Sequence, residues 1–191
     1  MITETTLRRL ASELTPAQDR SSSRHREVAR LIGQDGPVQT IEITATSELG
    51  APPSAVWRRV TTIAGINHEL GPWMRMTAPR GVELSVEAVP LGQTWFRSWV
   101  LLLGVLPFDY DELCIERLDP PSGFLERSRM LSAPRWEHER TLEPLRDDRT
   151  RVTDRVAFVP RLASAGRVHR ATIAAIFRHR HRRLRDAFPT H

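Results

Sequence analysis

Residues 167–188, RVHRATIAAIFRHRHRRLRDAF, decide the fold that this sequence predicts. Apolar side chains and one histidine recur there every three or four positions, which is the spacing of a helix with one buried face. The members of this stripe are Ile173, Phe177, His181, Leu184 and Phe188, widened by Ile176 and Ala187. Arginines occupy the opposite face, and Pro189 follows where a helix is expected to stop. We therefore expect a long terminal helix that buries one face.

The chain before this helix has the pattern of β-strands. From residue 40, apolar and polar residues alternate, as in a half-buried strand, until Pro52-Pro53-Ser54 ends the strand and opens a helix bearing Val56, Val60 and Ile63. A second helical turn is expected at 67–70. The expected strands are 40–48, 82–88, 93–103, 108–118, 123–130, 135–145 and 151–159. Short connections imply antiparallel neighbours, so we predict an α+β fold in which the terminal helix covers one face of the sheet.

Length and patterning divide the chain into two parts. A chain of 191 residues suits one domain of ordinary size with an extension. Residues 1–38 contain short apolar groups but no sustained stripe, and a polar stretch separates them. We expect a partly helical or disordered extension at 1–38 and a ligand-binding domain at 39–191.

The positive charge of the chain is concentrated in the terminal helix. All 28 basic residues are arginines, and the net charge is +5. Residues 167–191 contain seven arginines and one aspartate, so the rest of the chain is close to neutral. Because the other face of this helix is needed for the core, we interpret the arginines as a solvated face and expect no nucleic-acid partner. The sequence leaves the oligomeric state open.

Cysteine use and hydropathy favour a cytoplasmic protein. Cys114 is the only cysteine, which excludes an internal disulfide and fits a reducing compartment. The first 14 residues have no uninterrupted apolar core, so no secretory signal is visible. The most apolar run, residues 99–108, is too short to cross a bilayer as a helix and is interrupted by Gly104 and Pro107.

Five short stretches carry a resemblance to a known superfamily. They are APPSAVW at 51–57, ELGPWMRM at 69–76, WEHER at 136–140, TDRVAF at 153–158 and FRHRHRRL at 177–184. With the order of elements, they make residues 40–188 similar to the START-like or SRPBCC superfamily, which includes birch-pollen-allergen-like proteins, lipid-transfer domains and polyketide cyclase/dehydrases. The resemblance implies a helix-grip fold, in which a curved antiparallel sheet of about seven strands wraps the terminal helix and encloses a cavity. Many relatives have His in place of Arg140 and Tyr in place of Phe158, so roles of those groups do not transfer to this chain.

The alternation of side chains predicts which residues face the cavity. On each strand, residues two apart share a face, and the opposite faces of the last two strands are polar. The predicted ligand-binding set is Trp95, Arg97, Trp99, Trp136, His138, Arg140, Asp154, Phe158, Ile173, Phe177 and His181. Large rings supply contact area to a small molecule, and a few polar groups orient it. Each ring alone also fits a purely structural place in the core.

The polar members of this set have both structural and functional interpretations. If the turn at Asp147-Asp148 is tight, Arg140 and Asp154 lie opposite or diagonal on adjacent strands and form an ion pair, for which a structural role is favoured. His138 has no obvious partner in the sequence and is either a core histidine or an acid/base group, the one candidate for catalysis. His181 either closes the cavity floor or packs in the core.

Other chemistries lack support in the sequence. His179 and His181 lie two apart on a helix and diverge, so they cannot chelate one metal ion together, and we expect neither a metal nor a cofactor. Cys114 lies between Glu112 and Glu116, which disfavour a thiolate nucleophile. Two functions remain: an intracellular protein that binds an apolar or amphipathic molecule, lipid- or polyketide-like, and an aromatase/cyclase or dehydrase-type enzyme that uses His138 with Arg97 or Arg140 in the same cavity.

Overall fold

The structure is a computed structural model that describes residues 39–79 and 88–190. Seven strands, three α-helices and one short 3-10 turn make up these residues. Their order is β1 (Ile41–Leu49), α3 (Pro53–Val60), α4 (Ile63–Leu70), β2 (Met74–Met76), β3 (Thr94–Leu102), β4 (Leu106–Asp119), β5 (Gly123–Met130), β6 (Arg135–Pro144), β7 (Thr150–Val159), η2 (Ala163–Ala165) and α5 (Gly166–Ala187).

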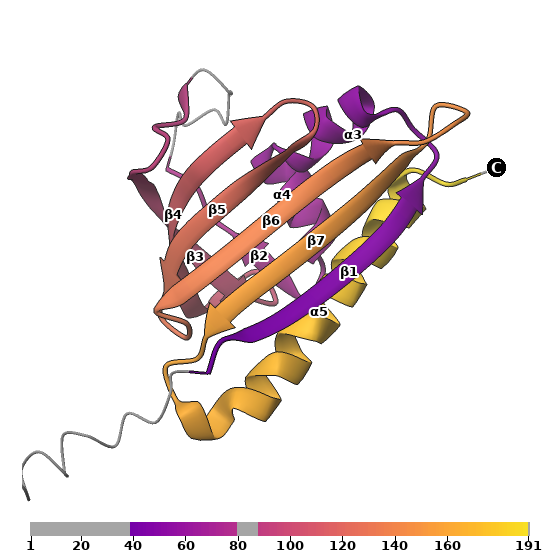
Figure 1. Cartoon of the computed structure of the whole chain (residues 1–191). Helices are drawn as coiled ribbons and strands as arrows, with labels where there is room; N and C mark the ends of the chain where they lie inside the picture. The colour runs from indigo at the N-terminus through magenta and orange to yellow at the C-terminus, as the bar shows by residue number, and fades with distance from the viewer. Residues whose placement is uncertain (1–38, 80–87, 191) are drawn as a thin grey trace, which may run out of the picture. The chain divides into compact units, whose positions relative to one another are not determined.

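The strands form one antiparallel sheet in the order β1-β7-β6-β5-β4-β3-β2. Tight turns join β3 through β7 in sequence, and β1 pairs with β7 at the far edge. Figure 1 shows the sheet curling and α5 lying along one face beneath β1 and β7. The predicted α+β helix-grip architecture, with two short helices after the first strand, is confirmed.

Helix α5 buries the stripe that its sequence predicts. Its buried residues are Ile173, Phe177, His181 and Leu184. Leu184 packs in a cluster with Leu49, Val56, Trp57 and Val152. Ile173 and Phe177 pack in a second cluster with Trp136, Val156 and Phe158. One helix face thus contributes to both parts of the core, since a stripe of this width covers the concave side of the sheet.

Helix α4 is a full helix that begins earlier than predicted. The sequence pattern places Ile63 on the preceding helix and only a turn at 67–70, whereas the structure ends α3 at Val60 and starts α4 at Ile63. The Thr62 hydroxyl accepts a hydrogen bond from the Gly65 N–H at 3.0 Å and so caps the new helix. A Cβ at Gly65 would collide with the Arg59 carbonyl, so glycine permits the close approach of the two helices.

Strand β2 is absent from the predicted set because three residues are too few to show alternation. A side chain fixes it instead: the Asn67 amide accepts from the Met76 N–H at 2.7 Å and donates to the Met76 carbonyl at 2.9 Å. This contact holds the edge strand to α4. The strand predicted at 82–88 lies, apart from its last residue, outside the described residues, and there Ala88 is not in a strand.

Loss of the α5 side chain at Leu184 should strongly destabilise the domain. Leu184 is 1% exposed and does not contact the pocket described below, so Leu184→Ala leaves a cavity in the core and should lower the free energy of unfolding by about 2–5 kcal/mol. Urea unfolding followed by circular dichroism measures this change. Val168→Ala, at a position on the same helix that is 71% exposed, is the control and should change stability by less than about 0.5 kcal/mol. Equal effects of the two would contradict the buried stripe.

Candidate functional site

A pocket of about 450 Å³ lies between the sheet and the helices α3, α4 and α5. Most of its lining is apolar and includes Ile66, Phe96, Leu113, Phe124 and Ile176. A smaller polar group also faces it, made of Ser98, Asp109, Asp111, Glu126, Ser132, His138 and Arg180, with Thr61, Thr172 and His169. Its volume falls within the range of about 300–1,000 Å³ typical of small-molecule sites.

Five residues of the predicted ligand-binding set line this pocket. They are Trp95, Trp136, His138, Ile173 and Phe177. They come from β3, β6 and α5, and strand alternation and helix spacing together place them on the concave side.

The prediction that Arg97 and Trp99 face the cavity is wrong. Arg97 lies on the outer face, where its Nη2 is 2.6 Å from Glu112 Oε1 and its guanidinium lies 4.5 Å from the centroid of the Tyr110 ring. Trp99 is 46% exposed and meets Tyr110 edge to face. A register shift between Thr94 and Phe96 interrupts the alternation, and beyond it the inward positions are Phe96, Ser98 and Val100.

Four other predicted residues face inward but lie beneath the pocket wall. Phe158 is 1% exposed and packs beside Trp136 with ring centroids 6.0 Å apart. Arg140, Asp154 and His181 are also buried, and none of the four lines the pocket. Direct ligand contact was predicted for them, but other residues of β6 and α5 form the pocket surface there, and no residue of β7 lines the pocket. The alternation of side chains predicts which face of the sheet a residue lies on but not how deeply it is buried, so it could not separate residues that line the pocket from residues beneath its surface.

Arg140 and Asp154 form the predicted ion pair. They are directly opposite in the register of β6 and β7. Arg140 Nε donates to Asp154 Oδ1 and Nη2 donates to Oδ2, both at 2.7 Å. Both side chains are fully buried, so the two parallel bonds compensate for the loss of water around each charge.

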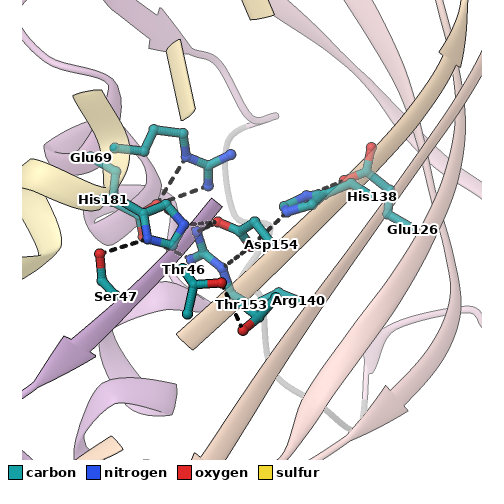
Figure 2. A network of polar contacts seen from close by, with 10 residues as sticks. Thr46, Ser47, Glu69, Glu126, His138, Arg140, Thr153, Asp154 and His181 are labelled. Atoms are coloured by element: carbon teal, nitrogen blue, oxygen red, sulfur yellow. Dashed lines mark hydrogen bonds and ion pairs between the residues drawn. The ribbon is translucent and has the colours of Figure 1, made fainter. Parts of the chain in front are cut away.

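Two histidines complete the coordination of Asp154. His138 Nε2 lies 2.9 Å from Asp154 Oδ1, and His181 Nε2 lies 3.0 Å from Oδ2; the carboxylate accepts in both cases (Figure 2). Ser47 Oγ accepts from Arg185 Nη1 at 2.7 Å, so its own hydrogen points to His181 Nδ1 at 2.9 Å. The expectation that His138 has no partner is therefore wrong, because its partner belongs to another strand. His181 packs in the core and does not form the cavity floor.

Glu69 is a member of this cluster that sequence reasoning missed. It is 1% exposed at the end of α4, and its carboxylate accepts from Arg140 Nη1 and Nη2 at 3.0 Å and from Arg180 Nε at 2.9 Å. The sequence offers one signal, because Glu69 lies next to the apolar Leu70 at the end of α4 and one helical turn after the apolar Ile66. We call Glu69, His138, Arg140, Asp154, Arg180 and His181 the Asp154 cluster.

The cluster keeps its carboxyl groups ionised. Burial alone would raise the pKa of Asp154, but Arg140 and His138 more than offset it and hold that pKa well below its usual range. Burial likewise opposes ionisation of Glu69, yet Arg140 and Arg180 lower its pKa. Burial also opposes the protonation of His138, and the Asp154 carboxylate reverses this, so the pKa of His138 is raised.

A second polar group, the carboxyl pair Asp111–Glu126, lies at the pocket wall on β4 and β5. Asp111 is 4% and Glu126 7% exposed, and both line the pocket. Glu126 faces His138 across the β5–β6 register, with its Oε2 3.7 Å from His138 Nδ1, which is too long for a direct hydrogen bond. Asp111 Oδ1 and Glu126 Oε1 have no hydrogen-bond partner among the described residues.

Sequence reasoning missed this pair, although one signal was present. In the strand 123–130, Arg127 and Arg129 share a face that belongs in water, so Glu126 must point inward. Burial, followed by the neighbouring Glu126, raises the pKa of Asp111 well above its ordinary range. The pair therefore holds a proton, because burying an ionised carboxylate without a cation bound to it costs free energy.

The comparisons with known proteins identify a family without a known function. Residues 47–188 match the sequence profile of the family described as "Domain of unknown function (DUF8410)". The chain belongs to this family. No curated protein matches the chain.

Solved structures share the fold at low sequence identity. A structural-genomics protein from Chromobacterium violaceum is 14% identical with a TM-score of 0.60, and the alignment covers 78% of this chain and 99% of that chain. A START superfamily protein from Mycobacterium smegmatis is 11% identical with a TM-score of 0.57, covering 77% and 96%. The Zhui aromatase/cyclase from a Streptomyces species is 14% identical with a TM-score of 0.51, covering 79% and 98%. The DUF8410 domain thus has the helix-grip fold of the START-like, SRPBCC superfamily.

Residues 39–79 and 88–190 offer neither a cluster of metal ligands nor a helix suited to crossing a membrane. No group of three or more His, Cys, Asp or Glu side chains in these ranges is arranged to hold a metal ion. None of the helices described there is long and apolar enough to span a bilayer.

A double-mutant cycle should show strong coupling between Arg140 and Asp154. Arg140→Gln or Asp154→Asn leaves a buried charge without its partner, so each should lower the free energy of unfolding by about 3–5 kcal/mol, while the double variant should cost less than the sum. Chemical unfolding of the four proteins measures the coupling. The exposed pair Arg127–Glu137, with Nε and Oε2 2.8 Å apart, is the control and should show little coupling. Additivity at Arg140 and Asp154 would remove the pairing as a determinant of stability.

Asp111 should make the domain less stable as pH rises. Its folded pKa lies well above the ordinary value of 3.8, so the folded state holds a proton that the unfolded state has released, and stability falls as pH rises from about 4 through the folded pKa. Asp111→Asn should remove this component and stabilise the domain increasingly toward higher pH. Thermal unfolding at several pH values measures the difference. Glu112→Gln, on the outer face of β4, is the control; a constant difference between wild type and Asp111→Asn would contradict the prediction.

Proposed function

We propose that this DUF8410 protein is an intracellular binding protein that holds an apolar or amphipathic small molecule, lipid- or polyketide-like, in the pocket between the sheet and α5. The observation that carries the proposal is the pocket itself, about 450 Å³ with a mainly apolar lining. A space of this size, bordered by several aromatic rings, favours binding of a small molecule by burial of its apolar surface.

The distribution of polar groups supports binding over catalysis by His138. An acid/base catalyst needs a group free to exchange a proton with the substrate. His138 donates from Nε2 to the buried Asp154 and turns Nδ1 toward Glu126, so its two ring nitrogens both face carboxyl groups of the protein. This arrangement suits a residue that orients neighbouring groups.

An acid/base enzyme of the aromatase/cyclase or dehydrase type is the second candidate. The observation in its favour is Glu126, which reaches both the pocket and the neighbourhood of His138 Nδ1. A proton can pass between a carboxyl and an imidazole so placed only after a small approach of the two. A polyketide-like compound that the protein returns with altered mass would support this candidate.

Partly filling the pocket from α5 should weaken ligand binding without unfolding the protein. Ile176 lines the pocket, whereas the adjacent Ala175 is exposed and does not. Ile176→Trp occupies part of the volume, so we expect it to weaken binding of an uncharged apolar fluorescent probe such as N-phenyl-1-naphthylamine by about tenfold or more, a loss of about 1.4 kcal/mol. Ala175→Trp should bind as wild type does.

Native mass spectrometry of the purified protein supplies an independent measure, because a ligand that co-purifies with wild type and with Ala175→Trp should be missing from Ile176→Trp. Thermal unfolding of the three proteins checks that each is folded. Equal binding of the probe by both tryptophan variants would argue against this pocket as the binding site.

A further inference from the structure

The polar groups at the pocket wall differ in whether their hydrogen-bonding atoms have partners. Asp109 is satisfied, because its Oδ1 accepts from the N–H groups of Tyr110 and Ser132 and its Oδ2 from the Ser132 hydroxyl. In contrast, Asp111 Oδ1 and Glu126 Oε1 are buried, border the pocket and lack a partner among the described residues. The proton that the pair holds supplies one donor, and the pocket is the place from which further donors can reach these buried oxygens.

The cationic side chains nearby are already engaged. Arg180 lines the pocket but directs both Nε and Nη2 to Glu69 at 2.9 Å. Arg140 is divided between Glu69 and Asp154. The wall formed by β4 and β5 therefore presents carboxyl groups with no arginine of the described residues bonded to them.

We propose that the carboxyl pair Asp111–Glu126 binds the protonated amino group of an apolar amine, whose hydrocarbon part fills the rest of the pocket. This inference rests on the proposed binding function and specifies the chemical class of its ligand. An ammonium group brings up to three N–H donors and a positive charge, which match two carboxyl groups with unpaired oxygens. A fatty acid or another anionic head group would meet like charge at the same wall.

Proton occupancy of the pair supports this assignment. Burial and the neighbouring Glu126 raise the pKa of Asp111, so the empty pair retains a proton. An ammonium group can replace that proton, and binding of the amine is then accompanied by proton release. The other titratable and charged groups that line the pocket are Asp109 on β4, beside Asp111, His138 on β6, beside Glu126, and His169 and Arg180 on α5.

Matched probes on the full-length protein test the inference. Naphthylmethylamine, naphthalenemethanol and naphthoate share one ring system and differ in the head group. Fluorescence titration of wild type at neutral pH should give an affinity for the amine about tenfold or more above that for the alcohol, and weaker binding of the carboxylate. The preference for the amine should decrease on acidification, because the pair then retains its proton.

Variants identify the groups responsible for the preference. The double variant Asp111→Asn/Glu126→Gln should bind the amine and the alcohol within about twofold of each other. The control Glu112→Gln/Glu137→Gln removes two carboxylates from the outer face of the sheet and should keep the wild-type preference. Thermal unfolding checks that both variants are folded. If the double variant does not fold, the affinities of the single variants for the amine and the alcohol are compared instead.

The outcomes separate the two proposals. If wild type binds the alcohol as tightly as the amine, this inference is overturned and the binding function stands. The same conclusion follows if the folded double variant still prefers the amine. Failure of wild type to bind any probe, or undiminished binding by Ile176→Trp, counts against the proposed function and with it against the amine.

Discussion

The fully buried carboxylate of Asp154 is the group on which the rest of this structure depends. It accepts hydrogen bonds from Arg140 and His138 on β6 and from His181 on α5 (Figure 2). Through Arg140 it is connected to Glu69 on α4, which Arg180 of α5 also binds. Because a buried charge is costly unless each of its hydrogen bonds is made, the sheet and both helices must be in place together. The cluster thus links elements that lie far apart in the sequence.

The charge balance of this cluster shapes the pocket above it. Glu69 and Asp154 engage Arg140 and Arg180, so the opposite charges compensate within the cluster. Asp111 and Glu126, on the neighbouring strands, bind no arginine of the described residues, although His138 Nδ1 lies 3.7 Å from Glu126. Burial and the neighbouring Glu126 therefore raise the pKa of Asp111. The pocket therefore has an apolar lining with one acidic wall. Any assignment of function must rest on this asymmetry and not on the architecture, because one fold serves unrelated functions.

Most of the architecture could be predicted from local patterns. The apolar stripe of α5 and the alternation in β1, β6 and β7 each repeat over enough residues to outweigh local exceptions. The errors occurred where the pattern was short or interrupted. Strand β2 has three residues, α4 depends on the cap at Thr62, and the register shift near Trp95 reversed the faces assigned to Arg97 and Trp99. Side chains alternate between the two faces of a strand, so one extra residue at a bulge exchanges the faces of the positions that follow it.

The sequence by itself determined the helix-grip order of elements, the inward face of β6 and β7, and the pairing of Arg140 with Asp154, because these follow from periodicity and from the register of one hairpin. Only the tertiary structure decided that His138 and His181 meet Asp154, that Glu69 and Arg180 complete the cluster, and that Asp111 and Glu126 border the pocket without a partner. Glu69 lies 71 residues from Arg140 and 111 from Arg180 in the sequence, so no local pattern connects them. His138 and Asp154 are diagonal neighbours in one hairpin, where alternation gives the shared face but not the side-chain conformation that joins them. The burial of these groups depends on how far the sheet curls around α5. Neither the separation nor the depth is encoded in the spacing of residues along one element.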